Sequence, residues 1–214
     1  MKKIAIVDIM GGFGNQLFAI CFGLQLQNNG FKVYYYFSDN KNSKEIDYNP
    51  SNRQLVINPK KFGIKKLRKF HIYLLKFFKK NYKIIFENEI NTSLEKVFPE
   101  RYTFITSFNG QFQDCLLYEN NKELIDNIIL NDKINKTFNL ADCGYISSPS
   151  NKPEVVLKDF KMMINSKNFI VGNSTFSLFA SLIGHEKDSI IVIDKNFYEN
   201  IKNIKYFSEN VYLI

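Results

Sequence analysis

The chain has 214 residues, is 45% apolar and carries a net charge of +8. This length and composition are those of one large globular domain or two small ones, and no uncharged run approaches the length needed to span a bilayer. The three cysteines, Cys21, Cys115 and Cys143, are far apart and show neither metal-ligand spacing nor a disulfide framework, so we expect a protein of the reducing cytoplasm without a signal peptide.

A glycine-rich stretch near the N-terminus organises the first part of the chain. An apolar run at 4–9 precedes the sequence GGFGNQLF at 11–18, and an uncharged apolar run at 17–26 follows it. The sequence Asn-Asn-Gly at 28–30 then predicts a helix end, and an aromatic-rich run occupies 31–37. The order predicts a β-α-β unit with its glycine loop at the carboxyl end of the first strand, where open α/β sheets bind their ligands.

The glycine loop fits an anion-binding helix start, although it matches no standard nucleotide fingerprint. Glycine lets backbone N–H groups approach a ligand, and a helix start attracts a phosphate. However, the G-x-G-x-x-G spacing fails at Leu17, and the lysine and hydroxyl of a P-loop are absent. The alternative is a set of glycines that only lets the helix pack closely on a strand. The adjacent amides Asn15 and Gln16 favour a ligand, because they are unusual at the start of a buried helix.

Residues 60–83 hold the positive charge of the chain: they contain ten Lys or Arg and no Asp or Glu, and the other residues together have a net charge of −2. Apolar residues recur between the lysines at roughly helical spacing, which predicts a helix. This helix is interpreted either as a solvated helix packed on the protein body or as an amphipathic helix on an anionic membrane surface. No motif supports nucleic-acid binding, and His71 is expected to be structural.

The rest of the chain is predicted to form short strands and helices, with one polar linker that separates 1–130 from 154–214. We expect a loop at 38–58 with a short strand near 55–57, strands at 82–86 and 102–106, a strand end with a polar turn at 108–114, a helix at 121–130, the linker at 131–153, a helix at 155–165, a strand at 169–172, a polar turn at 173–175, a helix at 176–183 and a strand at 189–193.

Several of these stretches resemble one enzyme family. GGFGNQLF at 11–18, after a first strand, is similar to the N-terminal signature of the bacterial α-1,2-fucosyltransferases, glycosyltransferase family 11. FIVGNSTFSLFASL at 169–182 resembles the family's F-I-x-x-N-S-T/S-F-S-W-W-A-A-W-L signature, with Leu-Phe in place of Trp-Trp. KDFKMM at 158–163 resembles its E-D-L-x-L-M run, and FNGQFQD at 108–114 resembles its GYFQS element.

The resemblance implies an α/β fold of the GT-B type, with two Rossmann-like halves of which the second is truncated. It implies an inverting galactoside 2-α-L-fucosyltransferase that takes fucose from GDP-fucose, needs no metal or other cofactor, and acts on a galactose-type acceptor of a bacterial surface polysaccharide. The glycine loop would lie beside the donor's sugar-phosphate, Ser174 and Thr175 at its pyrophosphate and Asp159 at its guanine. The implied substrate-binding residues are Gly11, Gly12, Phe13, Gly14, Asn15, Gln16, Asp159, Asn173, Ser174, Thr175 and Ser177.

One element of the family is missing from this sequence. Members carry an H-x-R-x-x-D motif whose arginine pairs with the pyrophosphate, but neither histidine of this chain is followed two residues later by arginine. A leaving nucleotide needs a preorganised cation, for which lysine is not an equivalent substitute. Two further hypotheses therefore stay open: an inactive, truncated family member with at most a binding role, and a basic membrane- or nucleic-acid-binding module that depends on 60–83. The sequence identifies no general base: Asp8, Asp39 and Glu87 are the candidate carboxylates, and Asp8 is the one close to the glycine loop.

Overall fold

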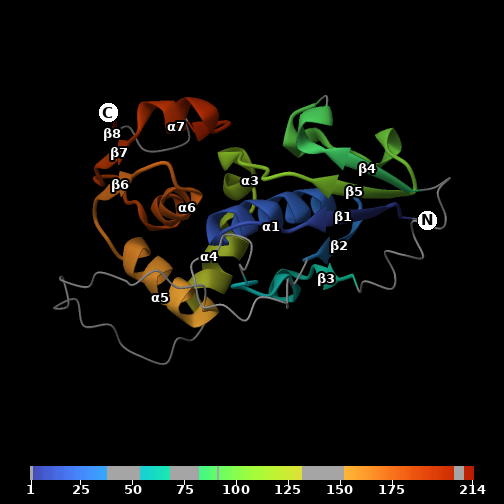
Figure 1. Cartoon of the computed structure of the whole chain (residues 1–214), viewed down its shortest axis with the longest axis horizontal. Helices are drawn as coiled ribbons and strands as arrows, with labels where there is room; N and C mark the ends of the chain where they lie inside the picture. Colours follow the sequence, from blue (N-terminus) through green and yellow to red (C-terminus); the bar gives the residue numbers. More distant parts are fainter. Residues whose placement is uncertain (1, 38–53, 68–81, 91, 132–151, 205–209) are drawn as a thin grey trace, which may run out of the picture.

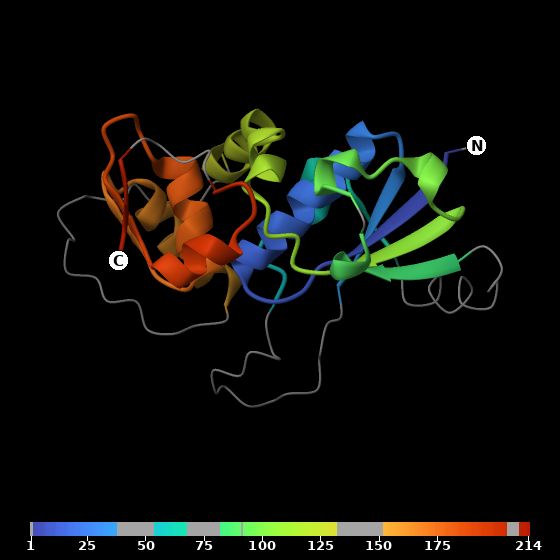
Figure 2. The same cartoon turned by 90° about the horizontal axis from the view of Figure 1, so that it is seen from above.

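The computed structural model describes residues 2–37, 54–67, 82–90, 92–131, 152–204 and 210–214. These residues form two parallel β-sheets with helices packed between and around them (Figures 1 and 2). The first sheet has the order β3-β2-β1-β5-β4, and the second has the order β6-β7-β8. In chain order the strands are β1 (Ile4–Asp8), β2 (Lys32–Tyr36), β3 (Lys65–Lys66), β4 (Tyr82–Phe86), β5 (Ile105–Asn109), β6 (Phe169–Val171), β7 (Ile191–Ile193) and β8 (Val211–Leu213).

Several helices begin where the sequence supplies a proline or a capping carboxylate. Pro153 opens one helix, and the side chains of Asp114 and Asp194 accept hydrogen bonds from the first turns of two others. The α-helices are α1 (Phe13–Asn28), α3 (Cys115–Glu119), α4 (Lys122–Asn131), α5 (Pro153–Ile164), α6 (Thr175–Gly184) and α7 (Lys195–Asn200), and short 3-10 helices lie at Pro59–Phe62, Glu87–Glu89, Leu94–Lys96 and Pro99–Arg101.

The predicted β-α-β unit is confirmed. Strands β1 and β2 pair in parallel, with Ile4 opposite Lys32, and α1 connects them. Strand β1 lies in the middle of the sheet, between β2 and β5. The chain is therefore a mixed α/β protein whose five-stranded parallel sheet is compatible with a Rossmann-like fold, while the GT-B arrangement stays a prediction.

Helix α1 lies at the centre of the molecule (Figure 2). Every residue from Phe13 to Leu26 except Asn15 is buried, as expected for a helix that is apolar on all sides. The first sheet packs on it, and so do α3 and α6. Phe18 lies 5.0 Å from Phe179 of α6, measured between ring centroids. One continuous hydrophobic core therefore extends from the first sheet to the second.

The structure differs from the predictions at 55–57 and at 60–67. The first segment is a bend and not a strand, because the N–H of Val56 donates to the side chain of Gln16 instead of to a neighbouring strand. The second is not an α-helix, because Gly63 ends a short 3-10 helix in the left-handed conformation and the chain continues into β3. Residues 68–81 of the basic segment, with His71, lie outside the described residues.

Most other predicted elements are confirmed, with shifts at their ends. Strand β5 begins at Ile105, three residues later than predicted, and α3, α7 and β8 were not predicted. Cys21 and Cys115 are free and buried, whereas Cys143 and almost all of the predicted linker lie outside the described residues. Among the described helices, none combines the length and the apolar character needed to cross a membrane.

Candidate functional site

The two stretches with the strongest family resemblance meet in the fold. The first turn of α1 packs on the start of α6. A Cβ atom built on Gly14 would lie 2.3 Å from the carbonyl carbon and oxygen of Thr175 and 2.6 Å from the nitrogen of Phe176. No side chain larger than a hydrogen atom fits this contact. Gly14 therefore has the close-packing role that the sequence left open for these glycines, and it packs on α6 instead of on a strand.

An aromatic cluster joins a third family-like stretch to this contact. Phe13 lies 4.8 Å from Phe160 of α5 and 6.3 Å from Phe176 of α6, measured between ring centroids. Phe160 and Phe176 are 5.1 Å apart. The ring of Phe13 is 3% exposed and belongs to the hydrophobic core. The predicted substrate contact of Phe13 can therefore involve only its backbone.

Gln16 ties the glycine loop to the segment after residue 53. Its side chain is 1% exposed. Its amide nitrogen donates to the carbonyl oxygens of Gly11 at 3.1 Å and Gln54 at 2.9 Å, and its oxygen accepts a 3.0 Å hydrogen bond from the N–H of Val56. Both donors of the amide are used by the protein itself. The described structure thus gives Gln16 an anchoring role, and its predicted substrate contact stays a prediction.

Asn15 is the motif amide that is not enclosed by the core. Its side-chain oxygen accepts a 3.1 Å hydrogen bond from Nε2 of Gln113, and the same nitrogen donates to Oε1 of Gln111 at 2.6 Å. Both glutamines belong to 108–114, the fourth family-like stretch, but the sequence did not single them out as site residues. All four stretches therefore converge around the first turn of α1.

The loop between β5 and α3, which carries these glutamines, is held from both halves of the chain. Phe112 is fully buried and has φ +52°, a conformation that is rare for a residue with a side chain. Oε2 of Glu87 accepts hydrogen bonds from the N–H groups of Gln111 and Phe112 at 3.0 and 2.8 Å. Nζ of Lys202 lies 3.5 Å from Oε1 of the same glutamate. The loop is therefore fixed in one conformation by several independent contacts.

The residues that lead into α6 are open to solvent, whereas the backbone of Thr175 and Phe176 packs on Gly14. Asn173 and Ser174 are exposed, and Thr175 is partly exposed. Ser174 occupies the N-cap position, but its side chain makes no capping hydrogen bond. Its carbonyl oxygen accepts a 3.0 Å hydrogen bond from the hydroxyl of Ser177. Capping therefore leaves the Ser174 hydroxyl unused, next to a helix N-terminus of the kind that attracts an anion.

Asp159 lies on α5, directly before Phe160 of the aromatic cluster. The residue is half-buried, and its Oδ1 atom is enclosed without a hydrogen-bond partner among the described residues. An enclosed carboxylate oxygen without a partner costs free energy, and the enclosure of this atom leaves the rest of the carboxylate as the part that a ligand could reach. The position implied for a base-binding carboxylate thus has an unused acceptor.

Asp8 ends β1, three residues before Gly11 of the glycine loop. Burial raises the pKa of its carboxyl group from an ordinary value of 3.8 to about 6. Within the described part of the chain, no hydrogen bond to this carboxylate offsets that effect. A carboxyl group with a raised pKa at the end of a parallel strand marks a candidate site. At neutral pH this group is ionised and can accept a proton.

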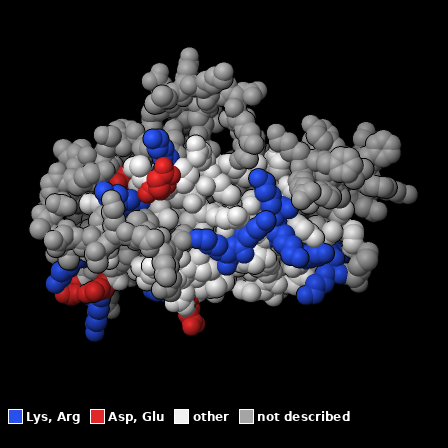
Figure 3. All heavy atoms as spheres, turned by 90° about the horizontal axis from the view of Figure 1, so that it is seen from below, with Lys and Arg blue, Asp and Glu red and all other residues white. Residues whose placement is uncertain are grey.

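Residues 60–67 of the basic segment lie at the β3 edge of the first sheet, and Lys83 lies on β4 at the opposite edge. Lys60, Lys61, Lys65 and Lys66 are all exposed. Figure 3 shows Lys and Arg side chains gathered over the half of the molecule that contains this sheet. Lysines on an edge strand also discourage pairing with another chain. The membrane contact of this segment stays a prediction.

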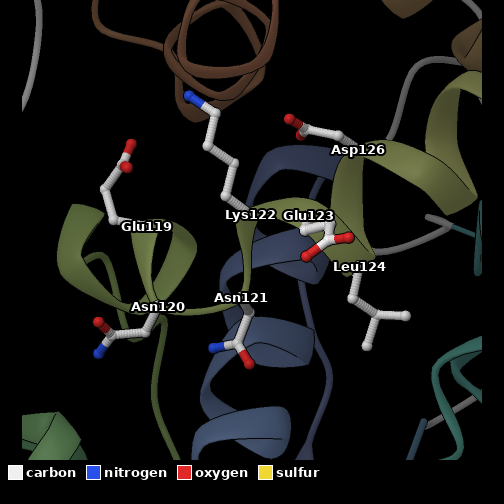
Figure 4. Close-up of a pocket in the computed structure, with 7 residues that line it drawn as sticks. All are labelled: Glu119, Asn120, Asn121, Lys122, Glu123, Leu124 and Asp126. Atoms are coloured by element: carbon white, nitrogen blue, oxygen red, sulfur yellow. The ribbon is translucent and has the colours of Figure 1, made fainter.

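A surface pocket of about 640 Å³ lies away from these motifs, at the turn between α3 and α4. There the side chain of Lys122 rises between those of Glu119 and Asp126 (Figure 4). Asp126 accepts a 2.8 Å hydrogen bond from the hydroxyl of Tyr118, and burial raises the pKa of its carboxyl group. The lining carries charges of both signs and none of the motif residues. We therefore place the candidate site at the motif junction.

Comparison with known proteins assigns no family to this chain: no protein-family model matches it, and neither a curated protein nor a solved structure matches it. Within the described ranges, no group of three or more His, Cys, Asp or Glu side chains could hold a metal ion. A functional assignment therefore depends on the sequence motifs and on the way the fold brings them together.

Proposed function

We propose that this chain is an inverting fucosyltransferase that transfers fucose from GDP-fucose, in α-1,2 linkage, to a galactose-type acceptor of a bacterial surface polysaccharide. The convergence of the four family-like stretches around the first turn of α1 carries this proposal. Their junction lies near the carboxyl ends of β1, β5 and β6, and parallel sheets bind ligands at such ends.

The donor is proposed to bind over the exposed turn that leads into α6, beside α5. The N–H groups at the start of α6 and the hydroxyls of Ser174 and Thr175 would bind the pyrophosphate, with Asn173 beside them. Asp159, which is half-buried, would accept hydrogen bonds from the guanine base through its carboxylate. The hydroxyl of Ser177 donates to the Ser174 carbonyl and so stabilises the turn that carries these groups.

Asp8 is the proposed general base. The acceptor oxygen forms a bond to the anomeric carbon on the face opposite the nucleotide, its proton passes to the base, and GDP leaves with the bonding electron pair. A carboxylate with a pKa of about 6 is ionised at neutral pH and is more basic than an ordinary aspartate. Its place next to the glycine loop supports this role.

A second candidate function is nucleotide-sugar binding without transfer. The missing H-x-R-x-x-D motif favours it, because the leaving nucleotide needs a nearby cation. The cations closest in sequence to Asp159 are Lys158 and Lys161 on α5, with Lys152 at the N-cap of that helix. A lysine supplies a point charge and not the bidentate donor pair of arginine. The absence of the motif arginine therefore favours slow transfer or none.

Calorimetric titration of the folded chain with GDP and GDP-fucose, followed by a transfer assay with a galactoside acceptor, tests both candidates. ADP serves as the control nucleotide. Binding with transfer supports the enzyme, and binding of GDP-fucose without transfer supports the second candidate. Absence of binding at about 1 mM ligand, by a protein that unfolds cooperatively, contradicts both.

The exposed lysines at the β3 edge are proposed to hold the enzyme on the anionic inner face of the cell membrane. Each lysine near such a surface contributes about 1 kcal/mol, so Lys60→Gln with Lys65→Gln should weaken binding to anionic vesicles more than about tenfold. Lys187→Gln with Lys195→Gln removes the same charge from exposed positions in the second half. Flotation with anionic vesicles measures this binding. Equal binding of the two double variants would contradict the proposed membrane contact of the β3 edge.

A further inference from the structure

A row of four side chains crosses the first sheet at its carboxyl edge. Pairing in register places Tyr36 of β2 opposite Asp8 of β1, and Phe86 of β4 opposite Asn109 of β5. The pairing of β1 with β5, continued by one residue, places Asp8 next to Asn109. Across the sheet the row is therefore Tyr36, Asp8, Asn109 and Phe86, and Figure 1 shows the strands that carry it side by side.

The row points away from α1. Side chains alternate along a strand, and the residues that directly precede the row belong to the core around α1. These core residues are Tyr35, Val7, Phe108 and Ile85. Earlier on the same face as the row, Ile6 and Ile105 form a separate apolar cluster. Only at the carboxyl edge does this face place a carboxylate and a carboxamide between two aromatic rings.

The polar groups of the row are poorly satisfied by the rest of the described chain. The Asp8 carboxylate accepts no hydrogen bond there. The oxygen of Asn109 accepts only a 3.5 Å contact from the hydroxyl of Ser107, and no acceptor for its amide nitrogen is found among the described residues. The ring of Phe86 is 55% exposed. An acceptor, a donor and an exposed ring are therefore available at one edge of the sheet.

This composition fits a neutral sugar ring. A hexopyranose carries hydroxyls that both donate and accept hydrogen bonds, and its C–H groups pack on the faces of aromatic rings. Asp8 supplies an acceptor, Asn109 a donor, and Phe86 an apolar surface. A phosphate fits less well, because the carboxylate would repel it and the row contains no Lys or Arg. The Cα atoms of Asp8 and Phe86 are two strand spacings apart, about 10 Å, which one pyranose ring with its hydroxyls can span.

We propose that Tyr36, Asp8, Asn109 and Phe86 form a binding site for a neutral hexopyranose. That this sugar is the galactose-type acceptor rests on the proposed function, whereas the site itself does not. An acceptor hydroxyl bound in this row lies against Asp8, so the same strand end selects the sugar and accepts its proton. Gln111 and Gln113, which follow β5, extend the neutral hydrogen-bonding surface beyond the row.

Saturation-transfer NMR of the full chain with methyl β-galactoside tests the site. We expect the parent protein to bind this probe with millimolar affinity and Phe86→Ala to weaken binding about tenfold. The matched control is Ile84→Ala, because Ile84 lies two residues earlier on the same strand and face and is 40% exposed. Thermal unfolding confirms that both variants are folded. Equal losses in the two variants, or no binding of the probe to the parent at about 50 mM, would overturn the site.

GDP titration of the same proteins separates this inference from the proposed function. Phe86→Ala should lose galactoside binding and keep the GDP affinity of the parent. A parent protein that binds the galactoside but not GDP would keep the sugar site and contradict fucosyl transfer. One that binds GDP but fails to bind the galactoside, with and without saturating GDP, would leave the nucleotide proposal standing and overturn the sugar site.

Discussion

The two strand-turn-helix units of this chain share an outline and differ in their surroundings. After β1 the chain turns through Gly11 into α1, and Gly14 is pressed against the backbone of Thr175. After β6 it turns through Gly172 into α6, and a Cβ atom on Gly172 would meet nothing within 4 Å. Gly14 therefore lies in a packed junction, whereas Gly172 lies in an open turn. A glycine signature therefore indicates a close approach, and only the fold shows whether a ligand or another helix makes it.

The sharpest test of this difference is a pair of glycine substitutions. Gly14→Ala should lower the free energy of unfolding by about 3 kcal/mol, because the new methyl group would overlap the Thr175 carbonyl. Gly172→Ala should change it by less than about 0.5 kcal/mol. Urea unfolding measures both. Equal stability of the two variants would contradict the packed junction.

The next effect concerns the anchoring of the glycine loop. Gln16→Ala leaves the N–H of Val56 and two carbonyl oxygens without their partner, and should cost about 2 kcal/mol of stability. Gln111→Ala, at an exposed position, is the control and should cost less than about 0.5 kcal/mol. Urea unfolding again gives the comparison. A Gln16→Ala protein as stable as the control would show that the amide does not hold the loop.

Asp8 gives a pH dependence of stability with a defined sign. Its folded-state pKa of about 6 lies above the ordinary value of 3.8, so the folded protein holds the proton more tightly than the unfolded chain. The free energy of unfolding should therefore fall as the pH rises from about 4 through about 6. Asp8→Asn should remove this part of the dependence and gain about 1 kcal/mol at pH 7, after allowance for partial exposure. Under the proposed function it should also abolish transfer.

Chemical unfolding of Asp8→Asn and the parent from pH 4 to pH 8 measures this effect. The matched control is Asp194→Asn, at the N-cap of α7, where the asparagine oxygen can still accept the N–H of Phe197, so this variant should keep the pH dependence of the parent. Parallel pH curves for the parent and Asp8→Asn would show that burial does not perturb Asp8.

The smallest effect on stability is expected for a substitution at the open turn before α6. The same substitution should clearly weaken the binding of GDP. Ser174→Ala removes a hydroxyl that makes no capping hydrogen bond, so unfolding should change by less than about 0.5 kcal/mol. GDP affinity should fall about fivefold if the hydroxyl binds the pyrophosphate. Asn196→Ala, at an exposed position of α7, should change neither quantity. Unchanged GDP affinity in Ser174→Ala would remove this hydroxyl from the donor site.

The fold could be predicted largely from local patterns. The apolar run of β1, the glycine turn and the uncharged run of α1 identify their elements. Elements that are buried on both sides appear in the sequence as continuous apolar runs, which are easy to recognise. Strand β5 was misplaced by three residues because Ser107 and Asn109 alternate with core residues on its other face. The segment 55–57 was predicted as a strand because its apolar residues cannot reveal that a glutamine side chain, forty residues away, binds its backbone.

The site was predicted less completely than the fold. The sequence found all four stretches but could not divide their residues between packing and binding, because that depends on pairs distant in the chain. Gln16 has both of its donors used by the protein, and Asn15 meets Gln113 across 98 residues. The aromatic and polar row at the carboxyl edge was missed for the same reason. Phe86 and Asn109 are far apart in the sequence, and only the register of the four strands brings them next to Asp8.

The shared core around α1 has a consequence for how any ligand enters and leaves. Enzymes built as two separate lobes often close by hinge rotation, which needs an interface that can part at little cost. Here Phe18 of α1 and Phe179 of α6 lie in one buried cluster, and parting the halves would expose it to water. Ligand exchange is therefore expected to depend on local rearrangements at the strand ends, with the two sheets moving as one rigid body.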